Sequence, residues 1–332
     1  MQLLSMVVFL TLSIMSSIVM MFVSSLFWVW VMTDMSTIFM IPFLSGETRR
    51  KKSWFTGVAT YFIVQFFGSA MILISMIIQW GSPTSPYCSA LMCFGFSLKL
   101  GLVPLHFWVA RSFIHFHYGG IFVVGAGQKV FIISAVPLFS DVPICANVFY
   151  WSAMVSMLYG PVAMFHAITV KSFLAYSSVN HTGFLVICSY FGLHLVFIYA
   201  FIYCVSMFFL NFFFWSGGCK LMKDLGTELP LHYKTGFFSI GLSFCGFPPF
   251  LDFCTKFLVI QLAIECQVPG VVVIILASSL INLVVWIWVI SLAASCEMRE
   301  SFTPTGSVGQ NVLNISCVIW NLFMGMGFSM LY

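Results

Sequence analysis

Four ionisable residues lie inside long apolar stretches of the sequence. Asp34, Lys99, Lys129 and Lys256 are flanked by apolar and aromatic residues. A charged side chain at the centre of a lipid bilayer costs about 2.5 to 3.5 kcal/mol on insertion scales, so such residues are usually retained for a function. Snorkelling or helix packing explains one such residue more easily than four. We therefore predict a row of protonatable sites that carries protons.

Asp34 and Lys99 are the buried pair of opposite charge that we propose from the centres of the spans. If they face each other, each stabilises the charge of the other until a third charge approaches. The pair would then act as a switch.

Weaker candidates surround this set. His181 follows the polar residues Tyr176, Ser177 and Ser178, which could hold water, and we include it as a further candidate relay residue. Asp252 follows the Pro248-Pro249 break, and the sequence leaves open whether it is a packing carboxylate exposed to an aqueous vestibule or has a function.

The sequence lacks the motifs of nucleotide, cluster and metal sites. Gly125-Ala126-Gly127 is not a dinucleotide fingerprint, there is no phosphate-binding loop, and the eleven cysteines contain no C-x-x-C pair. His115 and His117 have no further ligands nearby. We expect no nucleotide, redox centre or metal in this chain, and its few basic residues argue against nucleic acid.

The composition determines what kind of element must position these residues. Hydrophobic residues make up 61% of the 332 residues and charged residues 7%, and the mean hydropathy is +1.07. The long stretches are apolar on every face, which favours helices over the alternating strands of a membrane barrel. No basic region or cleavage site marks the start as a signal peptide. An all-α polytopic membrane protein is predicted.

Apolar runs divided at Gly, Pro and charged residues predict about eleven transmembrane helices of roughly 20 residues. The expected spans are 3–23, 26–44, 57–79, 90–112, 119–139, 147–169, 172–191, 194–215, 237–264, 270–292 and 310–331.

Basic residues outside the spans should gather on one side of the membrane. Ten basic residues fall in the loops after even-numbered spans or, for Arg111, at the end of such a span, and the opposite loops hold none: Arg49, Arg50, Lys51, Lys52, Arg111, Lys171, Lys220, Lys223, Lys234 and Arg299. This places the N-terminus inside and the C-terminus outside.

Two spans contain Gly and Pro next to a buried lysine. The fourth is interrupted at 101–104, after Lys99, and the ninth at 246–249, before Lys256. Because five spans separate them, the two broken helices run in opposite directions, as in inverted repeats with a midplane site. We predict a first five-helix repeat over 1–140, a second over 147–292 and an appended helix over 310–332.

Several of these motifs resemble the subunit 2 family of mitochondrial NADH:ubiquinone oxidoreductase, respiratory complex I, which belongs to the antiporter-like subunits. The resembling segments are 30–35, 61–65, 99–108, 128–129, 175–183, and 246–249 with Lys256. The resemblance implies that Asp34 stands at the position of a family glutamate, and that Lys99, Lys129 and Lys256 stand at family lysines. Two departures are the shorter carboxylate at 34 and Ala110-Arg111 in place of Pro-Glu.

The resemblance also implies a function and partners. The chain would translocate protons in the membrane arm, driven by quinone reduction in partner subunits that bind NAD, FMN, iron–sulfur clusters and ubiquinone. Its neighbours would be antiporter-like subunit 4, small subunit 4L, accessory subunits and lipids including cardiolipin. It would lie in the mitochondrial inner membrane, with the N-terminus in the matrix and the C-terminus in the intermembrane space. The alternatives are a stand-alone cation/proton antiporter and a purely structural membrane subunit.

Overall fold

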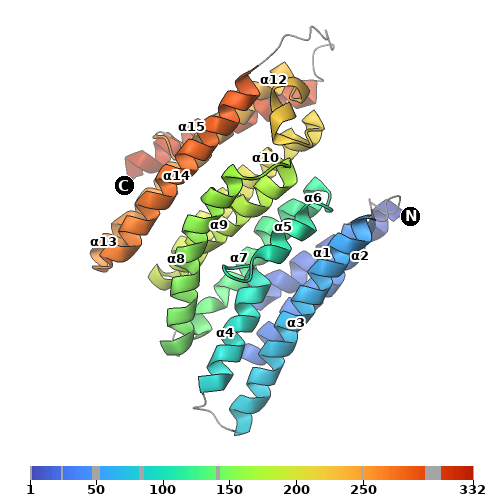
Figure 1. The fold of residues 1–332 in the computed structure, drawn as a ribbon, viewed down its shortest axis with the longest axis vertical. Helices are drawn as coiled ribbons and strands as arrows, with labels where there is room; N and C mark the ends of the chain where they lie inside the picture. The colour runs from blue at the N-terminus through green and yellow to red at the C-terminus, as the bar shows by residue number, and fades with distance from the viewer. Residues whose placement is uncertain are drawn as a thin grey trace. The chain divides into compact units, whose positions relative to one another are not determined.

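The structure is a computed structural model of the chain and describes residues 2–23, 25–46, 53–81, 86–139, 143–248, 250–295 and 308–331. These residues are almost entirely helical and form no strand (Figure 1), apart from an isolated bridge between Thr169 and Leu221. In a bilayer this follows from the backbone, because a helix satisfies its own amide and carbonyl groups without water. The predicted all-α class is confirmed.

The chain divides into two compact units. The first contains residues 1–160 and 174–200, and the second contains 161–173 and 201–332. Three helices, α8 (Pro143–Phe165), α9 (Val170–Phe191) and α10 (Leu193–Gly217), contribute to both units. The boundaries of these units follow contacts and are no test of the predicted repeats.

The first unit begins with three long helices, of which α1 packs against α2 and α2 against α3. The α3 helix then packs against both pieces of the fourth predicted span, α4 and α5. The bounds are α1 Gln2–Met20, α2 Leu26–Gly46, α3 Ser53–Gly81, α4 Pro86–Leu100 and α5 Phe107–Phe113.

The fifth predicted span changes its helical geometry part-way along. It consists of α6 (Tyr118–Phe122), a π-helical turn η1 (Val123–Gly127) and α7 (Gln128–Ser134), followed by the 3₁₀ turn η2 (Val136–Phe139). A π turn widens a helix and often occurs next to functional residues. Here the turn ends two residues before Lys129.

The second unit places its helices around α12. This helix packs against α13, α14 and α15. The bounds are η3 Met222–Asp224, α11 Leu225–Glu228, α12 Leu231–Cys245, α13 Leu251–Glu265, α14 Pro269–Ala294 and α15 Val308–Leu331.

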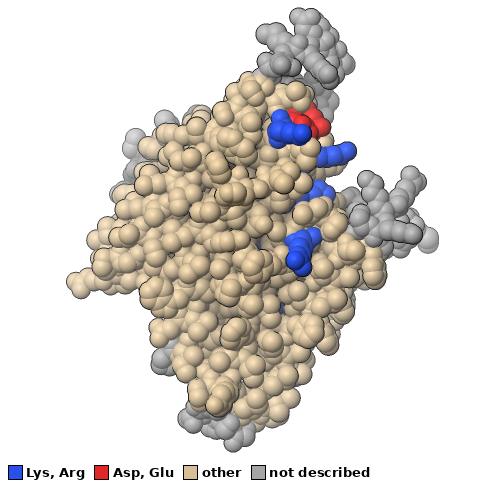
Figure 2. Space-filling view, in the orientation of Figure 1, with Lys and Arg blue, Asp and Glu red and all other residues tan. Residues whose placement is uncertain are grey.

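Six helices of the described chain are long and apolar enough to cross a membrane: 26–45, 55–80, 118–138, 144–165, 193–217 and 269–294. In the view of Figure 2 nearly all of the visible surface is free of charged side chains. The chain is therefore a polytopic membrane protein. The other five expected spans correspond to α1 and α15, whose described apolar segments are short, to the two interrupted helices and to the more polar α9, so the number eleven stays a prediction.

Three of the basic residues assigned to one side of the membrane lie within helices or at their ends. Arg111 is in α5, and Lys171 and Lys234 lie near the beginnings of α9 and α12. Lys234 is 7% exposed and its Nζ donates to the Gly226 carbonyl at 3.1 Å. A long amine can be buried when a carbonyl accepts its hydrogen bond. Arg299 and the basic run 49–52 lie outside the described residues.

Candidate functional site

The break predicted at 101–104 in the fourth span is confirmed, and its first part is a capped helix end. α4 stops at Leu100, and Gly101 takes a left-handed conformation with φ +70°. The amide of Leu102 donates to the Ser97 carbonyl at 3.1 Å, and that of Gly101 donates to the Leu98 carbonyl at 3.2 Å. This is the Schellman pattern, which favours glycine at the left-handed position. The carbonyls freed by the break are thereby partly satisfied.

Lys99 lies in the last turn before this break and contacts α2. Its Nζ donates to Asp34 Oδ1 at 2.6 Å and to Thr33 Oγ1 at 2.9 Å. The lysine side chain is fully buried, whereas that of Asp34 is 25% exposed. The sequence proposed this pair only on the condition that the two helices face each other, and the structure places the two groups in contact. It is a charge-assisted hydrogen bond between two helices.

Residues of α3 that the sequence analysis noted only as part of the resembling segment 61–65 lie between two of the lysine positions. Gln65 Nε2 donates to the backbone carbonyl of Lys99 at 3.3 Å. Four residues earlier, on the same face of α3, Tyr61 donates to Gln128 Oε1 at 2.8 Å. Gln128 precedes Lys129, so α3 connects the first break to the helix of the next lysine. Two polar residues spaced by four in an apolar span were the available signal.

Lys129 binds neutral oxygen atoms. Its Nζ lies 3.2 Å from Ser178 Oγ and 3.5 Å from the Ser178 carbonyl, and its side chain is 2% exposed. Ser178 belongs to the polar run of α9 that the sequence singled out. In the same helix, His181 Nδ1 lies 3.0 Å from the hydroxyl of Tyr199 on α10 and the imidazole is 3% exposed. One buried helix therefore contacts Lys129 and carries His181.

The break predicted at 246–249 is also confirmed, although Pro249 lies outside the described residues. α12 ends at Cys245, and Gly246 follows with φ +81°. The amide of Phe247 donates to the Leu242 carbonyl at 3.3 Å, and that of Gly246 donates to the Ser243 carbonyl at 2.8 Å. Both breaks therefore have the same cap, with glycine at the same place.

Lys256 reaches back across this second break. Its Nζ donates to the carbonyl of Phe244 at 3.1 Å, and Asn282 Nδ2 on α14 donates to the same oxygen at 2.7 Å. Lys256 is 5% exposed. Thus Asp34 and Lys99 form an ion pair, whereas Lys129 and Lys256 each bind neutral acceptors. Ser178 and Asn282 as partners were not predicted, because they depend on how separate helices are rotated.

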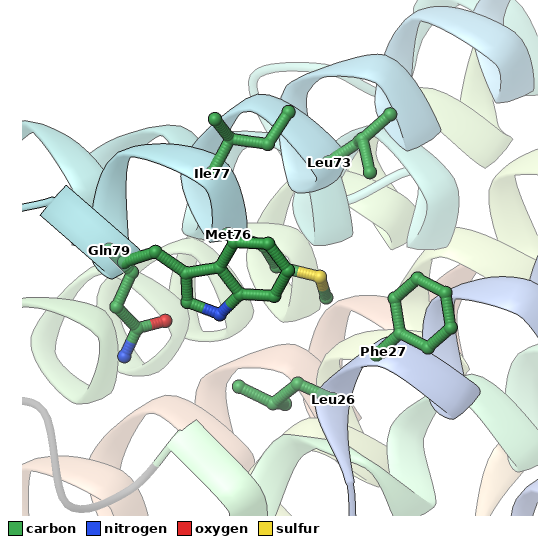
Figure 3. Close-up of a pocket in the computed structure, with 7 residues that line it drawn as sticks. Leu26, Phe27, Leu73, Met76, Ile77 and Gln79 are labelled. Carbon is green, nitrogen blue, oxygen red and sulfur yellow. The ribbon is translucent and has the colours of Figure 1, made fainter.

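A surface pocket lies apart from these residues (Figure 3). Trp80 and Gln79 at the end of α3, together with Phe27 near the start of α2, line it with mostly apolar neighbours. None of the candidate proton-carrying residues lines this pocket.

Comparison with known proteins gives the family. Residues 23–282 match the family model of the transmembrane NADH:quinone oxidoreductase/Mrp antiporter proteins. The chain belongs to this family. The match includes Asp34, Lys99, Lys129, His181 and Lys256, so all five candidates lie in the part of the chain that antiporter-like proteins share.

Relatives and solved structures agree with the family. NADH-ubiquinone oxidoreductase chain 2 of Lumbricus terrestris is 24% identical over 273 residues, which is 79% of each chain. A chain of respiratory complex I from Thermus thermophilus superposes with a TM-score of 0.78 at 17% identity, over 97% of this chain and 78% of that one. A chain of the Mrp complex from Dietzia gives 0.77 at 16% identity, over 92% and 72%. The structural likenesses establish the antiporter-like fold.

Proposed function

We propose that this chain translocates protons as an antiporter-like membrane-arm subunit of an NADH:ubiquinone oxidoreductase, driven by quinone reduction in partner subunits. The observation that carries the proposal is the ion pair beside a broken helix between Lys99, which is fully buried, and Asp34, which is 25% exposed. Burying an ion pair is seldom worth its desolvation cost for stability alone. The helix break leaves backbone groups without helical partners next to the pair. In a membrane family that includes antiporters, a pair in this position is suited to gaining and losing a proton.

The proposed path begins at Asp34 and Lys99 and includes Lys129 and Lys256, with His181 as a further carrier. Approach of a positive charge would weaken the hold of Asp34 on Lys99, and Lys99 could then release its proton. Each proton moved against the membrane potential requires about 2.3 kcal/mol per 100 mV. Partner subunits would supply this energy, together with NAD, FMN, iron–sulfur clusters and ubiquinone.

The proposed architecture is eleven transmembrane helices in two inverted five-helix repeats, 1–140 and 147–292, with a final helix at 310–332. The shared cap at Gly101 and Gly246 supports equivalence of the two broken helices. The five-span separation predicts their opposite directions. The proposed location is the mitochondrial inner membrane, with the N-terminus in the matrix, next to subunits 4 and 4L, accessory subunits and lipids including cardiolipin.

A stand-alone cation/proton antiporter is the second candidate, since a chain of the Mrp complex has the same fold. Native mass spectrometry of the membrane complex that contains this chain separates the two. We expect it to be accompanied by flavin and iron–sulfur subunits. A complex with ion transport that lacks these subunits would contradict the proposal.

Substitution of Lys129 tests the relay against a purely structural role. In the assembled complex reconstituted into vesicles, Lys129→Gln should lower proton transport and quinone reduction together, because a coupled relay stalls as a unit. Lys171→Gln, at the beginning of α9 and not fully buried, is the matched control and should keep both rates. Normal proton-to-electron stoichiometry at full rate in Lys129→Gln would contradict the relay.

A further inference from the structure

Asp252 is a buried carboxylate that the proposed path does not use. It lies in the first turn of α13 and is 4% exposed, so it does not face an open vestibule. Its backbone amide donates to Ser243 Oγ at 3.4 Å, but within the described residues its Oδ2 accepts no hydrogen bond. A buried oxygen of this kind normally has a partner. This oxygen is therefore available to accept a proton or a hydrogen bond.

Lys256 follows Asp252 by four residues on the same helix, a spacing that puts both side chains on one face. In the described part of the chain Lys256 forms no ion pair, in contrast to Lys99. Its ammonium group instead donates to the Phe244 carbonyl across the break. The second break thus holds a carboxylate and an amine that are near each other but separate.

The Phe244 carbonyl does not depend on Lys256. Asn282 Nδ2 donates to it at 2.7 Å, which is shorter than the 3.1 Å bond from the lysine. If the ammonium leaves, the carbonyl keeps one donor and is not left unsatisfied. Gly246 also leaves room beside the amine, because a Cβ there would lie 3.4 Å from Nζ. Lys256 can therefore change partners at low cost.

The other groups that interact with Asp252 are formally neutral hydroxyls and a thiol. They come from α10 (Tyr203 and Ser206), α12 (Ser243) and α13 itself (Cys254). Cys245 on α12 lies near Lys256. Among these groups Lys256 is the cation and Asp252 the acid. The neighbours can donate or accept hydrogen bonds, but none of them balances the charge of Asp252 in place of Lys256.

We propose that Asp252 exchanges a proton with Lys256, so that the second broken helix holds its own acid–base pair. The ammonium group moves from the Phe244 carbonyl to Asp252; one N–H bond breaks and one O–H bond forms. The lysine becomes a neutral amine, and the carboxylate becomes a carboxylic acid that passes the proton to the next carrier. This inference rests on the proposed function.

The test uses the assembled complex in vesicles. Asp252→Asn keeps the shape of the side chain but cannot carry the proton, so it should lose most of the proton transport of the wild type. Asp252→Glu keeps a carboxyl and should restore transport. Glu265→Gln removes an exposed carboxylate from the other end of the same helix and is the control. A deuterium-sensitive carboxylic acid band in the infrared difference spectrum during turnover should be absent from Asp252→Asn.

The outcomes distinguish this inference from the proposed function. Normal transport in Asp252→Asn, while Lys129→Gln is impaired, would overturn the inference and leave the proposed function intact. Transport that none of these variants affects would overturn both. Asp252 could act only by placing a negative charge at the positive end of the helix dipole. The Asp252→Asn complex would then have a lower thermal stability but unchanged transport per assembled complex. If Asp252→Asn does not assemble, an assembled Asp252→Glu complex without transport overturns the inference.

Discussion

At the scale of residues, the acceptor that holds each buried lysine differs. Lys99 binds a carboxylate and a hydroxyl, Lys129 binds Ser178, and Lys256 binds a backbone carbonyl. Within the described residues, only the Lys99 bond joins two groups of opposite charge, so Coulomb attraction adds to the hydrogen bond there. Lys99 should therefore be held more firmly than the other two, as a switch requires.

Thr33 offers a graded change at the pair. Thr33→Val removes the hydroxyl that accepts from Lys99 at 2.9 Å but keeps the ion pair with Asp34. A hydrogen bond to a charged group contributes about 1.5 to 3 kcal/mol, so we expect coupled transport to slow by about tenfold or more. The rate of proton uptake into vesicles measures this.

Thr37→Val is the matched control for this change. Thr37 lies one turn further along α2, and its hydroxyl donates to the backbone carbonyl of Asp34 without contacting Lys99. Equal rates in the two valine variants would mean that the hydroxyl of Thr33 has no particular role at the amine.

At the scale of elements, close contact between α3 and α4 supports the site. A Cβ at Gly95 would lie 2.7 Å from the Gly68 carbonyl and 2.6 Å from Ile72 Cγ1. Small residues allow membrane helices to approach closely, and this closeness replaces the hydrophobic driving force that is missing in lipid. The contact also brings Gln65 to the carbonyl of Lys99.

Gly95→Ala should push α3 and α4 apart and destabilise the complex. The added methyl group meets backbone and a branched side chain, and such overpacking costs about 1 to 3 kcal/mol. We expect a lower thermal midpoint of the assembled complex. Gly270→Ala is the control, because a Cβ there meets nothing within 4 Å. An unchanged midpoint in Gly95→Ala would show that the helices separate without cost.

The sequence predicted the helices and their breaks better than the contacts between the helices. Gly and Pro between apolar runs marked both breaks, since glycine favours the left-handed cap and proline lacks an amide donor. The position of Asp34 near the centre of its predicted span suggested it as the partner of Lys99. The π turn before Lys129 and the Asn282–Phe244 bond could not be predicted, because they depend on small rotations and shifts between helices that many apolar sequences allow.

At the scale of the whole molecule, each compact unit contains one broken helix with a buried lysine, Lys99 in the first and Lys256 in the second. The proposed orientation rests on the basic residues, because Lys and Arg accumulate in the cytoplasmic or matrix loops of short-loop membrane proteins.

Protease access tests the orientation. The basic run 49–52, which lies outside the described residues, should be cut by trypsin in inverted inner-membrane vesicles and protected in mitoplasts. A tag placed after Tyr332 should show the reverse access and serves as the control. Cleavage at 49–52 from the intermembrane-space side would contradict the proposed orientation.

The central claim is that the Asp34–Lys99 pair switches proton release, and the proton-to-electron ratio of Asp34→Asn tests it most directly. Losing the carboxylate leaves the buried amine without its counter-charge, at a cost of several kcal/mol unless it becomes neutral. The assembled Asp34→Asn complex in vesicles should then have lost coupled proton transport, and Asp34→Glu should retain it. A normal proton-to-electron ratio at the full rate of quinone reduction in Asp34→Asn would contradict the account and make the pair a packing contact.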